Sequence, residues 1–171
     1  MTGRCAVLGF AAFSGTGKTT LLKQLIPLLS NRGLKIAVIK HTHHDIELDQ
    51  PGKDSYELRH AGAKQTLLAG PNRSILITEI PSPSLDELLE SLDRQALDLI
   101  LVEGFREAAI PKIELQRSIL ARPFLFAHDP HIIAIASDKP ENIVTDLPRL
   151  DLNNPAEIAE FIRQTILPHE N

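Results

Sequence analysis

The sequence predicts an α/β fold in which a doubly wound, mostly parallel sheet is flanked by helices and accompanied by additional antiparallel or edge strands. Apolar runs of strand length alternate with helical patterns along the chain, and a glycine-rich loop joins the first run to the first helix. The 171 residues, 43% of them hydrophobic, suffice for a substantial core. We therefore expect residues 1–171 to form one domain.

Four runs are apolar on both alternating faces, which is typical of strands inside a parallel sheet that helices cover. They predict strands at residues 5–13, 35–42, 98–105 and 131–138. Helical patterns predict helices at residues 17–31, 55–61 and 85–93. A last helix is expected after Asn154, which can cap it, and Pro155, which suits its first position.

Two further segments are typical of strands of another kind. Residues 64–70 and 73–80 flank Pro71-Asn72 and predict a hairpin. In "IPKIELQRS", Ile113 and Leu115 alternate with polar residues, so one face of this strand should meet water or a partner. Such an exposed strand fits pairing with a second copy, hence a homodimer, and equally a charged edge strand on a monomer. Residues 119–130 show no period and predict a loop or lid.

Composition restricts the environment and the partners of the protein. With 18 basic and 22 acidic residues, no net positive field is available to gather nucleic acid. Cys5 is the only cysteine, which excludes an intrachain disulfide and a zinc site made of thiolates, and favours the reducing cytoplasm. No apolar run has the ~20 residues that a membrane-spanning helix needs, so no membrane partner is expected.

The loop "AFSGTGKTT" matches the phosphate-binding pattern of P-loop proteins, except that Ala12 replaces the first glycine. Alanine is tolerable there only where the backbone keeps a negative φ. Backbone N–H groups and the first turn of the helix would surround the phosphates, and Lys18 would neutralise the β- and γ-phosphates. The loop therefore predicts a P-loop NTPase-like fold. The residues expected to bind the phosphates are Ser14, Gly15, Thr16, Gly17, Lys18, Thr19 and Thr20.

A magnesium ion beside the phosphates would need the Thr19 hydroxyl and an acidic residue at the end of a neighbouring strand. Glu103 ends the run "LDLILVEGF", and Gly104 after it would allow close approach of a γ-phosphate. Asp98 begins that run and is the poorer candidate, because the strand's length separates it from Glu103. A carboxylate that only caps the next turn is the alternative for Glu103.

Polar residues crowd the stretch "KHTHHDIELDQPGKDS" after the second predicted strand. Residues at the carboxyl ends of parallel strands face the ligand crevice, so His41 and Lys53 are expected to reach phosphates. Asp45 is expected to hold magnesium through water or to orient the attacking water, alongside Lys18 and Glu103. A transition-metal site at His41, His43 and His44, or a solvated polar loop, remains open.

Ser137-Asp138 ends the last predicted core strand. A carboxylate at this position can accept two hydrogen bonds from the N1–H and 2-amino edge of guanine, whereas adenine would leave it unpaired. Asp138 therefore predicts a preference for guanine. A carboxylate that caps the turn before Pro140 explains the same residue equally well.

Together, "AFSGTGKTTLLKQLIPLL", "IKHTHHD", "PGKDSYELRHAGA", "LDLILVEGF" and "IAIASD" resemble, in order and spacing, the MobB family of adapters in molybdopterin-guanine dinucleotide biosynthesis. The resemblance covers residues 7–165 approximately, and residues 117–130 fit it least. It implies a homodimeric P-loop protein that binds GTP and Mg²⁺, hydrolyses GTP weakly, and assists the guanylyltransferase that attaches GMP to molybdopterin. Its motifs map onto residues 15–20, 41–45, 52–55 and 103–104. Molybdopterin as bound cargo and molybdoenzyme apoproteins as partners belong to the same expectation.

Two other functions fit the loop. A small-molecule phosphotransferase would need mobile arginines over the transferred phosphate, and the arginines occur singly along the chain. They are Arg59, Arg73, Arg106, Arg117 and Arg122. A metal-delivery GTPase would use the histidine cluster. The sequence favours the adapter, because no arginine-rich lid stands out and hydrolysis should be slow without a partner.

Overall fold

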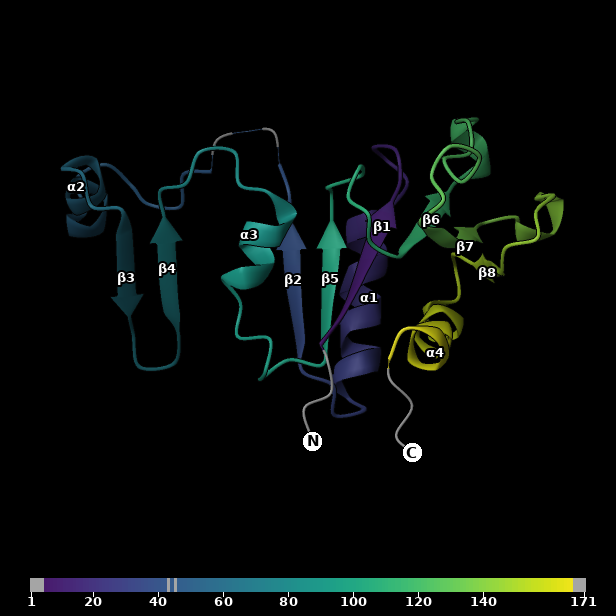
Figure 1. Cartoon of the computed structure of the whole chain (residues 1–171), viewed down its shortest axis with the longest axis horizontal. Helices are drawn as coiled ribbons and strands as arrows, with labels where there is room; N and C mark the ends of the chain where they lie inside the picture. Colours follow the sequence, from purple (N-terminus) through teal and green to yellow (C-terminus); the bar gives the residue numbers. More distant parts are fainter. Residues whose placement is uncertain (1–4, 43, 45, 168–171) are drawn as a thin grey trace. The chain divides into compact units, whose positions relative to one another are not determined.

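The computed structural model describes residues 5–42, 44 and 46–167 (Figure 1). It forms two compact units. The first comprises Met1–His41 and Leu88–Asn171, and the second comprises Thr42–Glu87. In the sequence, the second unit is therefore an insertion into the first. The described residues contain no helix long and apolar enough to cross a membrane.

The first unit is built on a parallel sheet of six strands, which confirms the predicted fold class. From one edge to the other, the strands are β2 (Ile36–Lys40), β5 (Leu99–Glu103), β1 (Ala6–Ala11), β6 (Lys112–Gln116), β7 (Ile132–Ser137) and β8 (Arg149–Asp151). Each strand runs parallel to its neighbours. β1 and β5 lie inside the sheet because they are apolar on both faces, and β5 is fully buried from Leu99 to Val102.

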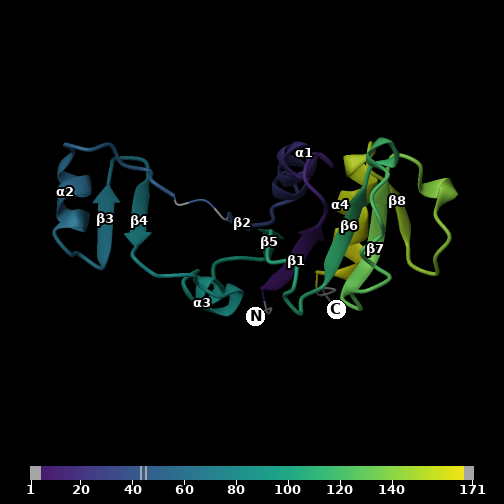
Figure 2. The same ribbon diagram turned by 90° about the horizontal axis from the view of Figure 1, so that it is seen from above.

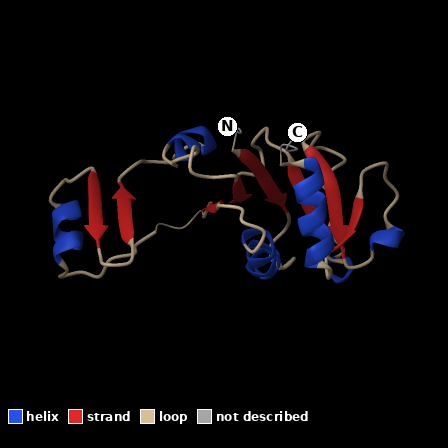
Figure 3. Ribbon diagram, turned by 90° about the horizontal axis from the view of Figure 1, so that it is seen from below, coloured by secondary structure: helices blue, strands red, loops and turns tan. Residues whose placement is uncertain are grey.

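Two helices lie against each other on one face of this sheet (Figure 3). In α1 (Lys18–Ser30), Leu21, Leu25 and Leu29 repeat every fourth residue and form a buried stripe. In α4 (Pro155–Thr165), Ile158 and Ile162 do the same. Asn154 caps α4 by accepting a hydrogen bond from the N–H of Glu157 at 3.3 Å, and Pro155 occupies the first turn, as predicted.

The prediction for residues 112–116 is wrong in one respect. β6 is not an edge strand with a wet face. It lies between β1 and β7, and all five of its residues are buried. The reason is that its polar side chains find partners inside the protein. Lys112 forms an ion pair with Asp129 at 2.9 Å, and Glu114 accepts hydrogen bonds from the N–H groups of Leu125 and Phe126, both at 2.8 Å.

The second unit consists of α2 (Asp54–His60) and the predicted hairpin, β3 (Gln65–Ala69) with β4 (Ser74–Thr78). Helix α2 packs beside β3 (Figure 2). Arg59 links the unit through polar contacts rather than an apolar core, since its guanidinium pairs with Glu47, Asp49 and Glu79. Helix α3 (Leu85–Glu90) follows the hairpin and leads into the first unit. The first unit also contains two short 3-10 helices, η1 (Ser118–Leu120) and η2 (Pro140–Asn142).

Candidate functional site

The loop between β1 and α1 has the geometry of a phosphate cradle. Gly15 and Gly17 adopt φ values of 83° and 99°, which side chains disfavour. Ala12 is not among the described residues with positive φ, so an alanine is tolerated at the position that usually holds glycine. The Thr16 hydroxyl is buried and donates to the Phe13 carbonyl at 2.8 Å, which closes the turn.

Lys18 starts α1 and folds back over the loop. Its Nζ atom donates to the carbonyl oxygens of Ala12 at 3.2 Å and Phe13 at 3.3 Å. Burial lowers the pKa of the Lys18 ammonium group, and the negative charge of Glu103 opposes this shift. The ammonium group therefore lies where a phosphate tail held by the loop would meet it. Ser14, Thr19 and Thr20 are exposed around it.

Glu103 reaches the same end of the sheet from β5. Its backbone is in register with Phe10 of β1 and Lys40 of β2. The Lys40 Nζ atom lies 3.9 Å from a Glu103 carboxylate oxygen, and the Glu103 side chain is only 13% exposed. A carboxylate and the Thr19 hydroxyl at the carboxyl end of a parallel sheet are the oxygen ligands that Mg²⁺ accepts beside a phosphate chain. The residues present thus fit the ion.

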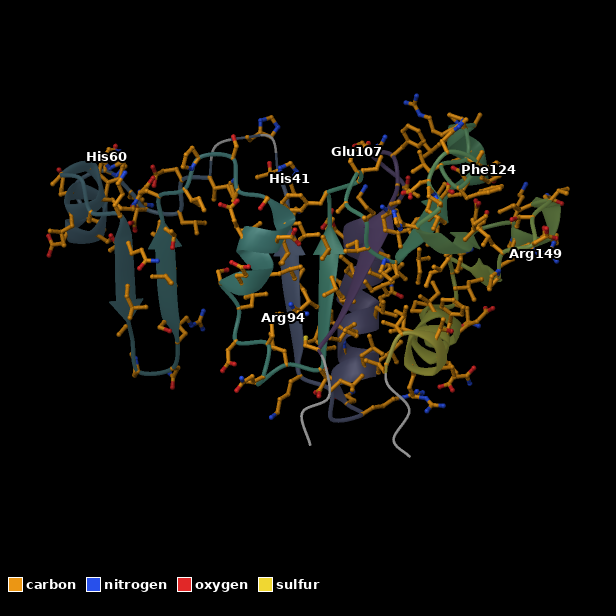
Figure 4. The ribbon with its side chains drawn as sticks, viewed as in Figure 1. His41, His60, Arg94, Glu107, Phe124 and Arg149 are labelled. Atoms are coloured by element: carbon orange, nitrogen blue, oxygen red, sulfur yellow. The ribbon has the colours of Figure 1, made fainter. Side chains whose placement is uncertain are left out.

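Gly104 brings the chain after β5 against His41. A Cβ at Gly104 would lie 2.5 Å from the His41 Cβ, and the φ of Gly104 is 99°, so only glycine fits. Phe105 follows with a φ of 47°, and its ring lies 4.5 Å from the His41 ring. Figure 4 shows His41, Glu107 and Phe124 at one end of the first unit, and Arg94 toward the other. Gly104 and His41 thus meet at the carboxyl ends of the strands.

Asp138 has a different neighbour from the one predicted. Its carboxylate accepts hydrogen bonds from the N–H of Ser118 at 2.8 Å and from the Ser118 hydroxyl at 3.1 Å. These bonds, led by the one from the backbone, lower the pKa of Asp138. Ser137 is buried, and its hydroxyl accepts from the N–H of Lys139 at 3.1 Å. Recognition of guanine by Asp138 stays a prediction, and a guanine edge would compete with Ser118.

Three further residues singled out in the sequence lie outside the part of the first unit described so far. Asp45 and His43 lie outside the described residues. Lys53 belongs to the second unit, where it precedes α2 and is exposed. Among the described residues, no group of three or more histidine, cysteine, aspartate or glutamate side chains is placed to hold a metal ion. The roles of Asp45 and Lys53 remain predictions.

The structure also brings together three arginines that the sequence analysis treated as scattered. The Arg106 and Arg122 guanidinium carbons lie 5.1 Å and 5.6 Å from the centre of the Phe13 ring. The Arg117 Nε atom donates to the Thr16 carbonyl at 3.2 Å. No pattern within one segment reveals this group, because its members come from loops after two different strands.

Comparison with known proteins decides the family. The family described as "MobB: Molybdopterin guanine dinucleotide synthesis protein B" matches residues 7–138. The chain belongs to the MobB family. Within this family, the match covers the P-loop, β5 with Glu103, and the end of β7 with Asp138.

Similar proteins cover nearly the whole chain. It is 50% identical over 168 residues to the molybdopterin-guanine dinucleotide biosynthesis adapter protein of Escherichia coli, with 95% of each chain covered. It is 44% identical over 163 residues to the adapter protein of the same name from Haemophilus influenzae, covering 95% of this chain and 90% of that one. The crystal structure of Bacillus subtilis MobB has a TM-score of 0.76 at 26% identity, covering 96% and 99% of the two chains. The similarity to MobB proteins therefore extends over nearly the whole chain.

Proposed function

We propose that this MobB family member is a GTP-binding adapter that works in the cytoplasm. It assists the guanylyltransferase that converts the molybdopterin cofactor to molybdopterin guanine dinucleotide, and it hydrolyses GTP weakly. The observation that carries the proposal is the P-loop, where Lys18 lies over a turn made by Gly15 and Gly17 at the start of a helix. The names of the similar adapter proteins support the pathway.

Magnesium belongs to the same proposal. Thr19 and Glu103 would hold Mg²⁺, with Asp45 as a further ligand through water. When bound, the ion would neutralise charge on the phosphate oxygens. The Glu103 carboxylate lies 3.9 Å from the Lys40 ammonium group, so it is already engaged in an ion pair. This contact supports slow hydrolysis until a partner rearranges the site, with molybdopterin as cargo and molybdoenzyme apoproteins as later partners.

A homodimer is supported by the second unit. The cross-strand pair Leu67 and Leu76 is 65% and 55% exposed, and Ile75, Leu58 and Leu48 are also exposed. An isolated two-stranded hairpin is only marginally stable in water. Exposed leucines facing each other across a hairpin suit a second copy of the chain, which would present the same apolar surface.

One observation favours a second candidate, a phosphotransferase acting on a small hydroxylated acceptor. Arginines placed over a phosphate stabilise the charge that develops in phosphoryl transfer, and three of them gather at the P-loop. Transfer of the γ-phosphate to an added acceptor, at a rate above release to water, would establish this activity in place of the adapter role.

The test of the adapter function is reconstitution. Guanylyltransferase activity is measured at limiting GTP with wild-type protein, with Lys18→Ala, and with Lys23→Ala as the control for an exposed lysine in the same helix. Wild type and Lys23→Ala should stimulate the transferase. Lys18→Ala should lose GTP binding by roughly 100-fold and give no stimulation, because a phosphate charge would be left unpaired. Equal stimulation by all three proteins would refute nucleotide-dependent assistance.

A further inference from the structure

We propose that Arg106, Arg117 and Arg122 form an arginine rim that binds the terminal phosphate of a nucleoside triphosphate in the P-loop. The inference deepens the proposed function, since it rests on nucleotide binding by that loop. It assigns the rim one task, which is to distinguish a triphosphate from a diphosphate.

Two members of the arginine rim form cation–π contacts with a ring of the P-loop itself. The Arg106 and Arg122 guanidinium carbons lie 5.1 Å and 5.6 Å from the Phe13 ring centre. Phe13 stands two positions before Gly15, so both cations lie beside the phosphate cradle. A cation–π contact uses none of the N–H donors of a guanidinium in a hydrogen bond, so those of Arg106 and Arg122 stay available to an anion. Both arginines are exposed, so a ligand can reach them.

The third member contacts the backbone of the loop. The Arg117 Nε atom donates to the Thr16 carbonyl at 3.2 Å, and Nη1 donates to the Asn153 side chain at 3.1 Å. A Cβ built on Gly17 would lie 3.7 Å from Nη2 of the same guanidinium. Arg117 therefore lies next to Gly17, whose N–H belongs to the cradle. A guanidinium has five N–H donors, and these two bonds leave three for an oxyanion.

Buried side chains of β6 hold the arginine rim in place. The Lys112 ammonium group donates to the Arg106 carbonyl at 3.0 Å, and the Gln116 amide donates to the Arg122 carbonyl at 3.0 Å. Both donors are buried, on a strand at the middle of the sheet. These bonds restrain the backbone at Arg106 and Arg122 before any ligand arrives. Such preorganisation lowers the entropy lost on binding, so more of the attraction between guanidinium and phosphate appears as binding free energy.

The local charge also suits a polyanion. The chain carries a net charge of −4, yet three guanidinium groups, Lys18 and Lys40 gather near this loop. Their acidic neighbours are Glu103, beside Lys40, and Asp138, near Arg117. A local excess of positive charge in an acidic protein is a specific feature rather than a general attraction to anions. The negative charge added by a third phosphate would be attracted most strongly beside these cations, because Coulomb attraction increases at short distance.

Calorimetric titration with GTP and with GDP, both in Mg²⁺, tests the arginine rim. Arg106→Gln and Arg122→Gln should each weaken GTP binding about 10-fold and GDP binding less than about 3-fold, because a bond to charged phosphate is lost only in the triphosphate. Arg106→Lys should recover part of the loss, since it restores the charge without the planar fork.

The matched control is Arg32→Gln, which removes the same charge from an exposed ion pair with Glu160. Arg32 follows the far end of α1, about 20 Å along the helix from the P-loop. This variant should bind both nucleotides as wild type does. Thermal unfolding of each variant verifies that it is folded, and the double variant Arg106→Gln/Arg122→Gln should abolish the preference for GTP.

Two results would overturn the arginine rim. Equal losses for GTP and GDP in folded variants would mean that the arginines only support the loop. Unchanged affinity for both GTP and GDP in the folded variants would mean that the arginines do not contact the terminal phosphate. Failure of the wild-type protein to bind GTP would instead refute the proposed function. If Lys18→Ala loses GTP binding while the rim variants bind as wild type does, the proposed function stands and the rim is rejected.

Discussion

Lys112 is a lysine that lies almost wholly inside the protein, with 2% of its surface exposed. Its ammonium group is surrounded by oxygen atoms, those of the Asp129 carboxylate at 2.9 Å, the Arg106 carbonyl at 3.0 Å and the Ala108 carbonyl at 2.5 Å. Three acceptors for three N–H donors satisfy the charge completely. Lys112 therefore connects the loop after β5 to the segment before β7.

Replacing Lys112 by methionine, which has similar length and no charge, should lower the free energy of unfolding by about 2–4 kcal/mol. The cost arises because the Asp129 carboxylate would lose its charged partner, keeping only its bond from the His131 N–H, and two carbonyls would lose a donor. Urea denaturation at pH 7 measures it. Lys23→Met on the exposed face of α1 is the control and should change stability by less than about 0.5 kcal/mol. A loss no larger than that of the control would mean that water replaces the ammonium group.

The junction between β6 and η1 is held by the strand next to it. Gln116 ends β6, Ser118 begins η1, and Asp138 follows β7. Both carboxylate oxygens of Asp138 accept hydrogen bonds from Ser118. We call these two bonds between Ser118 and Asp138 the Ser118–Asp138 clamp. Because Arg117 directly precedes Ser118, the clamp also restrains the backbone that carries Arg117.

Asp138→Asn should lower the free energy of unfolding by about 1 kcal/mol at pH 7, since the bonds to a charged acceptor are weakened at a partly exposed site. The hydrogen bonds from Ser118 and the nearby charge of Arg117 hold the pKa of Asp138 below its ordinary value of 3.8. The folded state therefore binds fewer protons than the unfolded state, so the contribution is complete above pH 3.8 and is lost as the pH falls through the folded pKa.

Unfolding of wild type and Asp138→Asn between pH 7 and pH 2.5 measures this dependence. The stability difference should be constant down to about pH 5 and should shrink below pH 3.8. A difference that is independent of pH over the whole range would contradict the assignment of the clamp to the charged carboxylate.

The elements that could be predicted are those in which the pattern of apolar residues within one segment indicates how that segment is buried. The runs around β1, β5 and β7 are apolar on both faces, and these strands do lie inside the parallel sheet. The run around β2 has the same pattern, but β2 is an edge strand and its Val38 is 45% exposed. β6 could not be read in this way. Its alternation of apolar and polar residues is the same for a wet edge and for a buried strand whose charges are paired, and the partners come from a loop with no period.

The same reasoning explains which parts of the site were predictable. Residues 14–20 are consecutive, so the pattern of glycines and Lys18 predicts a phosphate-binding loop even when the fold is unknown. Arg106, Arg117 and Arg122 meet at Phe13 and Thr16 because β5 and β6 both flank β1. Strand order is a property of tertiary packing, and single residues far apart in the sequence do not encode it visibly.

The two units of the molecule are stabilised by different means. The first has an apolar core in which Leu8, Leu25, Leu101 and Ile158 are fully buried. In the second, α2 has no buried residue, β3 pairs with β4, and Arg59 forms ion pairs with Glu47 and Glu79. A unit of this kind has little apolar burial of its own, so association with another copy would supply what it lacks.

Sedimentation velocity should show a dimer for wild type and a monomer for Leu67→Asp/Leu76→Asp, because a carboxylate on each strand would be buried without a partner. The control is Val144→Asp, which changes a side chain that is 95% exposed in the first unit and should leave the dimer intact. A wild-type monomer at high concentration, or a dimer that survives both aspartates, would reject the hairpin as the interface.

The insertion of the second unit has an evolutionary consequence. The chain leaves the sheet after β2 and returns through α3 to β5, and these two strands are direct neighbours with Lys40 opposite Glu103. A shorter crossover that kept α3 would preserve this pairing and the phosphate loop. Within this insertion, the hairpin at residues 65–78 carries none of the residues proposed for nucleotide binding. Lineages can therefore enlarge, trim or exchange the hairpin and gain a new recognition surface while Asp45, Lys53 and the phosphate loop are kept.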